Sequence, residues 1–261
     1  MQGFQFLYSF KQYLGFLRKA TNQHGVHSPF VYDFLTKCLY DRKKYPAYPK
    51  LKSYRKSILN DQKTIKITDF GAGSRVFKDN TRKVSDLGKN AGANLKRMRL
   101  LYRVTTYFQS ENILELGTSV GLATAAFGLA ETGKVTSVEG CAEISKIASQ
   151  KLDVLEISHL HLKNERFEAF FEENLANAYD LIYFDGNHSK KATFSYFETL
   201  LHSAHNDSVF IFDDIYWSVE MTEAWELIKQ HPKVRVTVDC FWLGFVFFRR
   251  EQEKEHFKIR L

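Results

Sequence analysis

The chain has 261 residues, of which 44% are hydrophobic and 26% are charged. This is the composition of a globular protein with a large core, and the 4 prolines and 14 glycines exclude collagen-like and low-complexity chains. The formal net charge of +7 is unevenly spread, because residues 1–110 hold 22 Lys and Arg against 6 Asp and Glu, whereas residues 111–261 hold 15 against 24. We therefore expect a basic region followed by an acidic one.

The cysteines and the apolar runs indicate where the protein resides. Cys38, Cys141 and Cys240 lie far apart and match no metal-ligand spacing, which favours reduced thiols and a cytoplasmic protein. The N-terminus lacks the continuous apolar stretch of a secretory signal. The longest apolar run, residues 241–248, is far shorter than the ~20 residues of a membrane-spanning helix. We expect no membrane span.

Residues 1–106 are predicted to form a basic helical accessory region. Apolar residues recur at helical spacing over 3–20, 29–40, 51–59 and 83–107. Ser28 and Pro29 are a typical helix start, with Ser as the N-cap and Pro at the first helical position.

Residues 107–261 are predicted to form a second domain, in which strands alternate with helices. The expected strands cover residues 113–116, 134–139, 160–163, 180–184, 208–212, 234–239 and 243–248. The expected helices between them cover residues 122–131, 142–155, 166–175, 189–202 and 219–230. Such alternation predicts a Rossmann-like α/β fold with a doubly wound, seven-stranded parallel sheet. The last two strands are too close for a crossover and should form an antiparallel hairpin.

The strongest local motif is Glu-Leu-Gly-Thr-Ser-Val-Gly, residues 115–121. A strand carries Glu115 to its end, and Gly117 and Gly121 bracket a turn that contains Thr118 and Ser119. Glycines allow a ligand close to the backbone, and ligands of open α/β sheets bind at the carboxyl ends of the strands. Glu139 ends the next strand, where a carboxylate can accept both hydroxyls of a ribose. The alternative is a tight turn that binds nothing.

A second set of polar residues follows the next strands. Asp185 ends one expected strand, and Asp213 and Asp214 end its neighbour. Three carboxylates without matching cations repel one another, and a divalent cation would relieve this repulsion. Alternatively, these aspartates cap helices or bind loop backbone. His188 follows Asp185 by three residues and either acts as a base or caps the next helix.

These motifs resemble those of class I S-adenosylmethionine-dependent methyltransferases. Asp-Gly-Asn-His-Ser, residues 185–189, is similar to the catechol-type O-methyltransferases that act on small molecules. Residues 24–30 and 69–74 resemble a bacterial branch of this family. The resemblance implies that residues 115–121 surround the methionine part of the cofactor, with Asp185 also at the cofactor, and that Glu139 holds its ribose.

The resemblance also implies how the acceptor is activated. Asp185 and Asp213 match the positions that bind Mg²⁺ in the catechol-type enzymes, whereas Asp214 replaces the usual Asn. His188 stands where those enzymes place the residue that deprotonates the acceptor hydroxyl. Residues 69–75 are either a plain glycine loop or a lid over the acceptor pocket.

We therefore expect an O-methyltransferase that uses S-adenosylmethionine and a divalent cation such as Mg²⁺ to modify a small hydroxylated acceptor. RNA methylation through the basic arm is one alternative, although we do not favour nucleic acid as the partner. A non-catalytic protein that binds the cofactor is another. The basic region could also dock against the acidic region of the same chain or of a partner in a homodimer.

Overall fold

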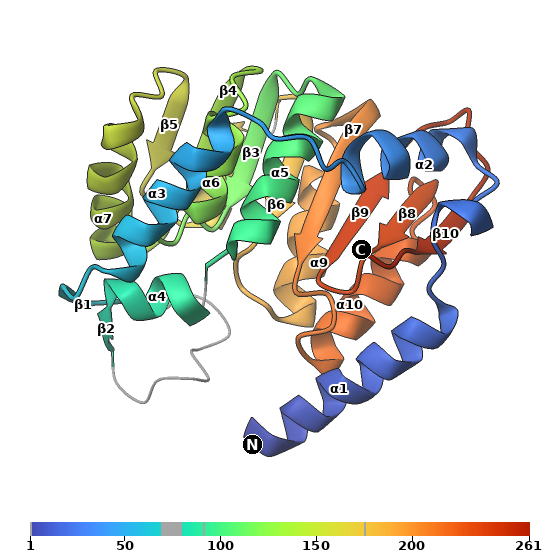
Figure 1. Ribbon diagram of the computed structural model, residues 1–261, viewed down its shortest axis with the longest axis horizontal. Helices are drawn as coiled ribbons and strands as arrows, with labels where there is room; N and C mark the ends of the chain where they lie inside the picture. The colour runs from blue at the N-terminus through green and yellow to red at the C-terminus, as the bar shows by residue number, and fades with distance from the viewer. Residues whose placement is uncertain (1, 69–79, 91, 175) are drawn as a thin grey trace. The chain divides into compact units, whose positions relative to one another are not determined.

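The computed structural model describes residues 2–68, 80–90, 92–174 and 176–261 (Figure 1). It confirms the expected α/β fold, with a mostly parallel main sheet and helices in the N-terminal region. The main sheet has eight strands and not the predicted seven, and a second sheet has two. Residues 69–75, the predicted lid, lie outside the described residues. No described helix is long and apolar enough to span a membrane.

The chain divides into two compact units, residues 1–40 with 174–261 and residues 41–173. These units do not follow the expected boundary at residues 106 and 107, which stays a prediction. Each unit is described below by itself.

The unit of residues 41–173 contains three parallel strands in the order β3-β4-β5. They are β3 (Asn112–Leu116), β4 (Lys134–Val138) and β5 (Leu160–Lys163). The helices are α3 (Ala47–Leu59), α4 (Val84–Asn90), α5 (Leu95–Phe108), α6 (Leu122–Gly128), α7 (Ala142–Leu152) and α8 (Phe167–Asn174). A small antiparallel hairpin joins β1 (Thr64–Lys66) to β2 (Thr81–Lys83).

The prediction of one long helix over residues 83–107 is wrong, because α4 and α5 are separate helices. Asn94 caps the start of the second helix, α5. Its backbone is extended and its side chain accepts a hydrogen bond from the Arg97 N–H, which is the geometry of an N-cap. The helix ends at Gln109 in the left-handed conformation.

The unit of residues 1–40 and 174–261 contains the strand order β10-β8-β9-β7-β6. These strands are β6 (Tyr179–Phe184), β7 (Ala204–Asp213), β8 (Val236–Asp239), β9 (Leu243–Phe247) and β10 (Glu255–Lys258). Its helices are α1 (Gln2–Lys19), α2 (Pro29–Phe34), α9 (Lys190–Leu200) and α10 (Val219–Gln230), and a π-helical turn, Leu35–Leu39, follows α2. The antiparallel pairing of β8 with β9 confirms the predicted hairpin.

Strand β9 is apolar on both faces because helices pack against both of them. Phe245 and Phe247 pack against Phe34 of α2, with ring centroids 5.3 and 5.5 Å apart. Gly244 faces the other side, where a Cβ would lie 2.7 Å from the ring of Trp225 of α10. Helices therefore cover both faces of this part of the sheet, as in Figure 1.

Strand β10 lies beyond the last of the predicted strands, which ends at residue 248. It pairs in parallel with β8, with Phe257 opposite Val238. Phe257 and Ile259 are buried, whereas His256 and Arg260 on either side of this pair are exposed and Lys258 between them is half-buried. This alternation with a period of two is typical of a strand, and β10 is the eighth strand of the sheet. The charged residues of β10 lie at the edge of the sheet.

Candidate functional site

The turn after β3 is a closely packed backbone loop. Gly117, Ser119 and Gly121 have φ angles of 104°, 46° and 74°. A Cβ at Gly121 would lie 2.7 Å from the Tyr54 hydroxyl, which itself donates a 2.8 Å hydrogen bond to the Val120 carbonyl. The positive φ and the close approach of Tyr54 together account for glycine at position 121.

Glu139 lies beside this turn at the carboxyl end of β4. One carboxylate oxygen accepts a 3.0 Å hydrogen bond from the Ser119 N–H, and the other accepts a 2.9 Å bond from the Cys141 N–H. Two of the predicted residues, Ser119 and Glu139, are thus brought together. Glu139 is half-buried, and a carboxylate oxygen can accept more than one hydrogen bond.

Glu115 is fully buried beneath the turn. Its Oε2 accepts 2.6 Å hydrogen bonds from Thr124 of α6 and Ser137 of β4, and the Ser137 hydroxyl lies 2.6 Å from that of Thr118. Burial raises the pKa of the Glu115 carboxyl to about 8. Among the described residues its other oxygen, Oε1, has no hydrogen-bond partner. Through these hydrogen bonds Glu115 connects β3 to β4 and α6, and its side chain is not exposed to a ligand.

The sequence reasoning missed three residues that build this site: Tyr54, Thr124 and Ser137. Thr124 and Ser137 are polar positions on an apolar helix and an apolar strand, and a buried acid needs such partners. That signal was available in the sequence. No local pattern indicated Tyr54, because it contacts the turn from 66 residues away.

The second cluster of predicted residues belongs to the other unit and follows β6. His188 Nε2 lies 3.7 Å from Asp185 Oδ1, and the exposed fractions of their side chains are 26% and 12%. Ser189 is the N-cap of α9, since its side chain accepts from the Ala192 N–H. The alternative role of His188 as the helix cap is therefore wrong.

Asp213 ends β7 and Asp214 follows it, but they do not form an open ligand set. Asp213 is buried, with Oδ2 accepting a 2.6 Å hydrogen bond from the Tyr183 hydroxyl and Oδ1 accepting a 2.8 Å bond from the Asp214 N–H. Within the described part of the chain, no group of three or more His, Cys, Asp or Glu side chains is arranged to hold a metal ion. The predicted set of Asp185, Asp213 and Asp214 is therefore not supported by this geometry.

Residues 114–215 match the sequence profile of a methyltransferase domain. The chain contains a methyltransferase domain. This domain includes residues 114–116 of β3, the turn after them, Glu139, the Asp185–His188 pair, Asp213 and Asp214. No curated protein matches the chain.

Solved structures of methyltransferases have a fold similar to that of this chain. PaMTH1 of Podospora anserina, a methyltransferase bound to SAH, has a TM-score of 0.60 at 10% identity, over 86% of this chain and 97% of its own. The SAH-bound O-methyltransferase of Bacillus cereus has a TM-score of 0.55 at 14% identity, over 80% and 93% of the two chains. TomG of Streptomyces achromogenes, an O-methyltransferase in complex with SAM, has a TM-score of 0.56 at 13% identity, over 79% and 91%. At these identities the likeness concerns the fold alone.

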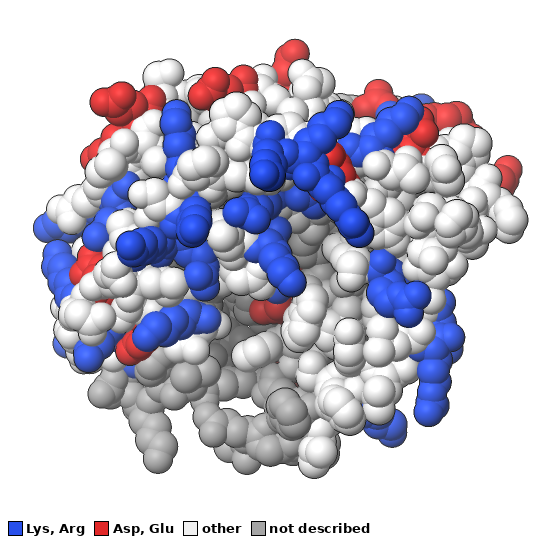
Figure 2. All heavy atoms as spheres, viewed as in Figure 1, with Lys and Arg blue, Asp and Glu red and all other residues white. Residues whose placement is uncertain are grey.

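Basic side chains gather over α3 and α5, as Figure 2 shows. Some of them pack within their own unit, since Arg103 donates a 3.1 Å hydrogen bond to the Tyr48 hydroxyl and Arg99 lies 4.9 Å from the centroid of the same ring. Others, such as Lys52, Lys56 and Lys96, are exposed. Part of the basic charge therefore contributes to packing.

Proposed function

We propose that the protein transfers a methyl group from S-adenosylmethionine to the hydroxyl of a small acceptor. The observation that carries the cofactor half is Glu139, whose carboxylate is fixed by the Ser119 and Cys141 N–H groups at the carboxyl end of β4. The methyltransferase domain and the cofactors in the neighbours' structures support the same choice. The O-methyltransferase neighbours and the Asp-Gly-Asn-His sequence after β6 support oxygen as the acceptor atom.

The residues around the turn would bind the cofactor as follows. Both Glu139 oxygens accept the ribose hydroxyls, and two backbone N–H groups hold the carboxylate in place before binding. Gly117 and Gly121 have no side chains that would block the approach of the cofactor to the backbone of the turn. S-adenosylmethionine, when bound, supplies a methyl group on a sulfonium, which a nucleophile can attack.

His188 would prepare that nucleophile. A neutral imidazole can take the proton of an acceptor hydroxyl near neutral pH. Asp185, 3.7 Å away, orients the ring and stabilises the imidazolium that forms. The oxygen then attacks the methyl carbon while the carbon–sulfur bond breaks, so that the products are a methyl ether, S-adenosylhomocysteine and protonated His188. Dependence on a divalent cation remains a separate prediction, and no step here uses one.

Calorimetry with S-adenosylhomocysteine tests the cofactor half. We expect the wild type to bind it and Glu139→Ala to lose at least about tenfold in affinity, because hydrogen bonds to a charged group are lost. Glu143→Ala is the matched control, since Glu143 is exposed on α7, four residues further along the chain. Absence of binding to the wild type, or equal affinity of the Glu139→Ala variant, would contradict the proposal.

Methyl transfer to catechol as a probe tests the catalytic half. The rate should rise with pH as imidazole loses its proton, and His188→Ala should lower it about 10²- to 10⁴-fold and abolish that rise. An unchanged pH profile in the variant would remove His188 from the mechanism. In the same assay, loss of activity in EDTA and recovery with Mg²⁺ would support the metal prediction, and full activity in EDTA would refute it.

A further inference from the structure

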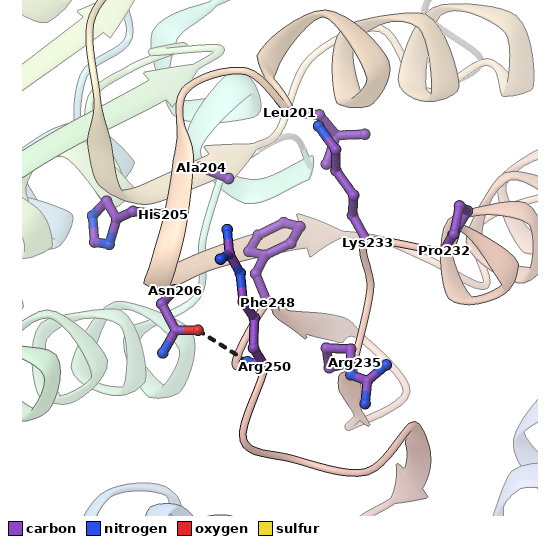
Figure 3. A pocket seen from close by; sticks show the side chains of 9 residues that line it. All are labelled: Leu201, Ala204, His205, Asn206, Pro232, Lys233, Arg235, Phe248 and Arg250. Carbon is purple, nitrogen blue, oxygen red and sulfur yellow. Dashed lines mark hydrogen bonds between the residues drawn. The ribbon is translucent and has the colours of Figure 1, made fainter.

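A pocket of about 400 Å³ opens in the unit of residues 1–40 and 174–261, apart from the residues discussed above (Figure 3). The lining residues that matter here are Leu201, Asn206, Lys233, Arg235, Phe248 and Arg250. The pocket borders the start of β7, whereas Asp213 is the last residue of the same strand. It therefore lies at the opposite end of β7 from the candidate catalytic residues.

One wall of the pocket is a bulge fixed by hydrogen bonds. Between two successive pairings, β6 advances from Tyr179 to Leu181 while β7 advances from Ala204 to Val209. The extra residues are held because the Ser208 hydroxyl donates to the Tyr179 carbonyl at 2.6 Å and accepts from the His205 N–H at 2.9 Å. Bulges of this kind commonly direct side chains toward a site.

Asn206 connects this wall to the segment after β9. Its side-chain oxygen accepts a 2.9 Å hydrogen bond from the Arg250 N–H, drawn in Figure 3, and its amide donates to Glu251 at 3.0 Å. Arg235 is fixed as well, because its Nε donates a 3.0 Å hydrogen bond to the Gln252 carbonyl. The pocket is thus held by contacts from three separate segments of the chain.

The charge of the pocket is positive and uncompensated. Three cations line it, Lys233, Arg235 and Arg250, and no carboxylate does. Among the residues that the structure describes, none of these cations has an ion-pair partner. The neighbouring acids serve other groups: Asp207 and Glu251 pair with Arg249 at 2.6 and 2.9 Å, and Asp180 pairs with His205 at 2.9 Å.

Apolar side chains line another part of the pocket. Phe248 is buried, and its ring packs edge-on against Phe210 at a centroid distance of 4.8 Å. In Figure 3 the ring lies between the side chains of Lys233 and Arg250, and Leu201 and Pro232 line the same pocket. A volume near 400 Å³ is within the range of small-molecule sites.

We propose that this pocket binds a small organic phosphate. The Arg250 guanidinium and the Lys233 ammonium recognise the phosphate oxygens, because arginine matches phosphate geometry and lysine adds a compact charge. The apolar part of the ligand packs on Phe248 and Leu201. The site is independent of the proposed methyl transfer, since it shares no residue with it.

Titration calorimetry of the full chain with phenyl phosphate tests the proposal. We expect one phenyl phosphate to bind per chain, inorganic phosphate to bind about tenfold more weakly, and phenol not to bind, because both the charge and the ring contribute. The double variant Lys233→Gln/Arg250→Gln should weaken phenyl phosphate binding about tenfold or more. Both residues are exposed, and thermal unfolding followed by circular dichroism checks that the variant is folded.

The control is Lys52→Gln/Lys56→Gln on α3, which removes the same charge from exposed positions outside the pocket. It should leave the affinity for phenyl phosphate within about twofold of the wild-type value. The proposal is overturned if phenyl phosphate does not bind, if phenol binds equally well, or if the pocket variant binds as the wild type does. Equal weakening by both double variants would also overturn it, because it would indicate attraction by net charge alone.

Discussion

Glu115 couples the stability of the protein to pH. Burial raises its pKa to about 8 from an ordinary value of 4.5, so the native state keeps a proton that the unfolded chain has lost between these pH values. The stabilisation is fully present below the lower value and is lost as pH rises through the higher one. At about 1.4 kcal/mol for each pKa unit, the contribution is of the order of several kcal/mol.

We therefore predict that the wild type loses stability between about pH 5 and pH 8 relative to Glu115→Gln, which cannot ionise. Urea unfolding at several pH values measures this difference. Glu143→Gln, at an exposed position, should follow the wild type. Parallel pH profiles for the wild type and Glu115→Gln would show that the carboxyl is already ionised in the native state.

Strand β10 closes its edge of the sheet through a small apolar contact. Ile259 follows the strand, is fully buried, and donates its N–H to the Asp239 carbonyl at 2.8 Å. Ile259→Ala should lower the free energy of unfolding by about 2–4 kcal/mol, because it leaves a cavity. Leu261→Ala, two residues on and 57% exposed, should change it by less than about 0.5 kcal/mol. Equal effects of the two substitutions in urea unfolding would show that the C-terminal segment is not packed on β8.

The elements show which parts of the fold a sequence can predict. The hairpin of β8 and β9 was predictable because the segment between the two strands is too short for a crossover. The start of α2 was predictable because the cap that Ser28 provides depends only on neighbouring residues. Strand β10 was missed because its few apolar positions stand among charges. Within the site, Glu139 was found from its place at a strand end, whereas Tyr54 needed a contact between distant segments. A sequence therefore predicts features that depend on neighbouring residues, but not contacts between segments that are far apart in the chain.

At the scale of the whole molecule, the charge is divided between a basic N-terminal part and an acidic remainder. Residues 1–110 hold 22 Lys and Arg against 6 Asp and Glu. Figure 2 shows part of this charge over α3 and α5, where Arg99 and Arg103 pack on Tyr48. A basic surface attracts any polyanion, so charge alone does not distinguish an RNA-modifying enzyme from one that acts on small molecules.

Measurements of RNA binding and RNA methylation distinguish an RNA-modifying enzyme from one that acts on small molecules. If the acceptor is a small molecule, a single-stranded RNA should bind with the non-specific Kd of about 10⁻⁴ to 10⁻⁶ M at physiological salt and should not be methylated. Fluorescence anisotropy over a salt series, together with transfer of a labelled methyl group, measures both properties. The triple variant Lys52→Gln/Lys56→Gln/Lys96→Gln removes exposed cations from α3 and α5 and should leave methyl transfer to a small acceptor unchanged. Tight RNA binding together with RNA methylation, both lost in this variant, would instead assign the basic surface to an RNA substrate.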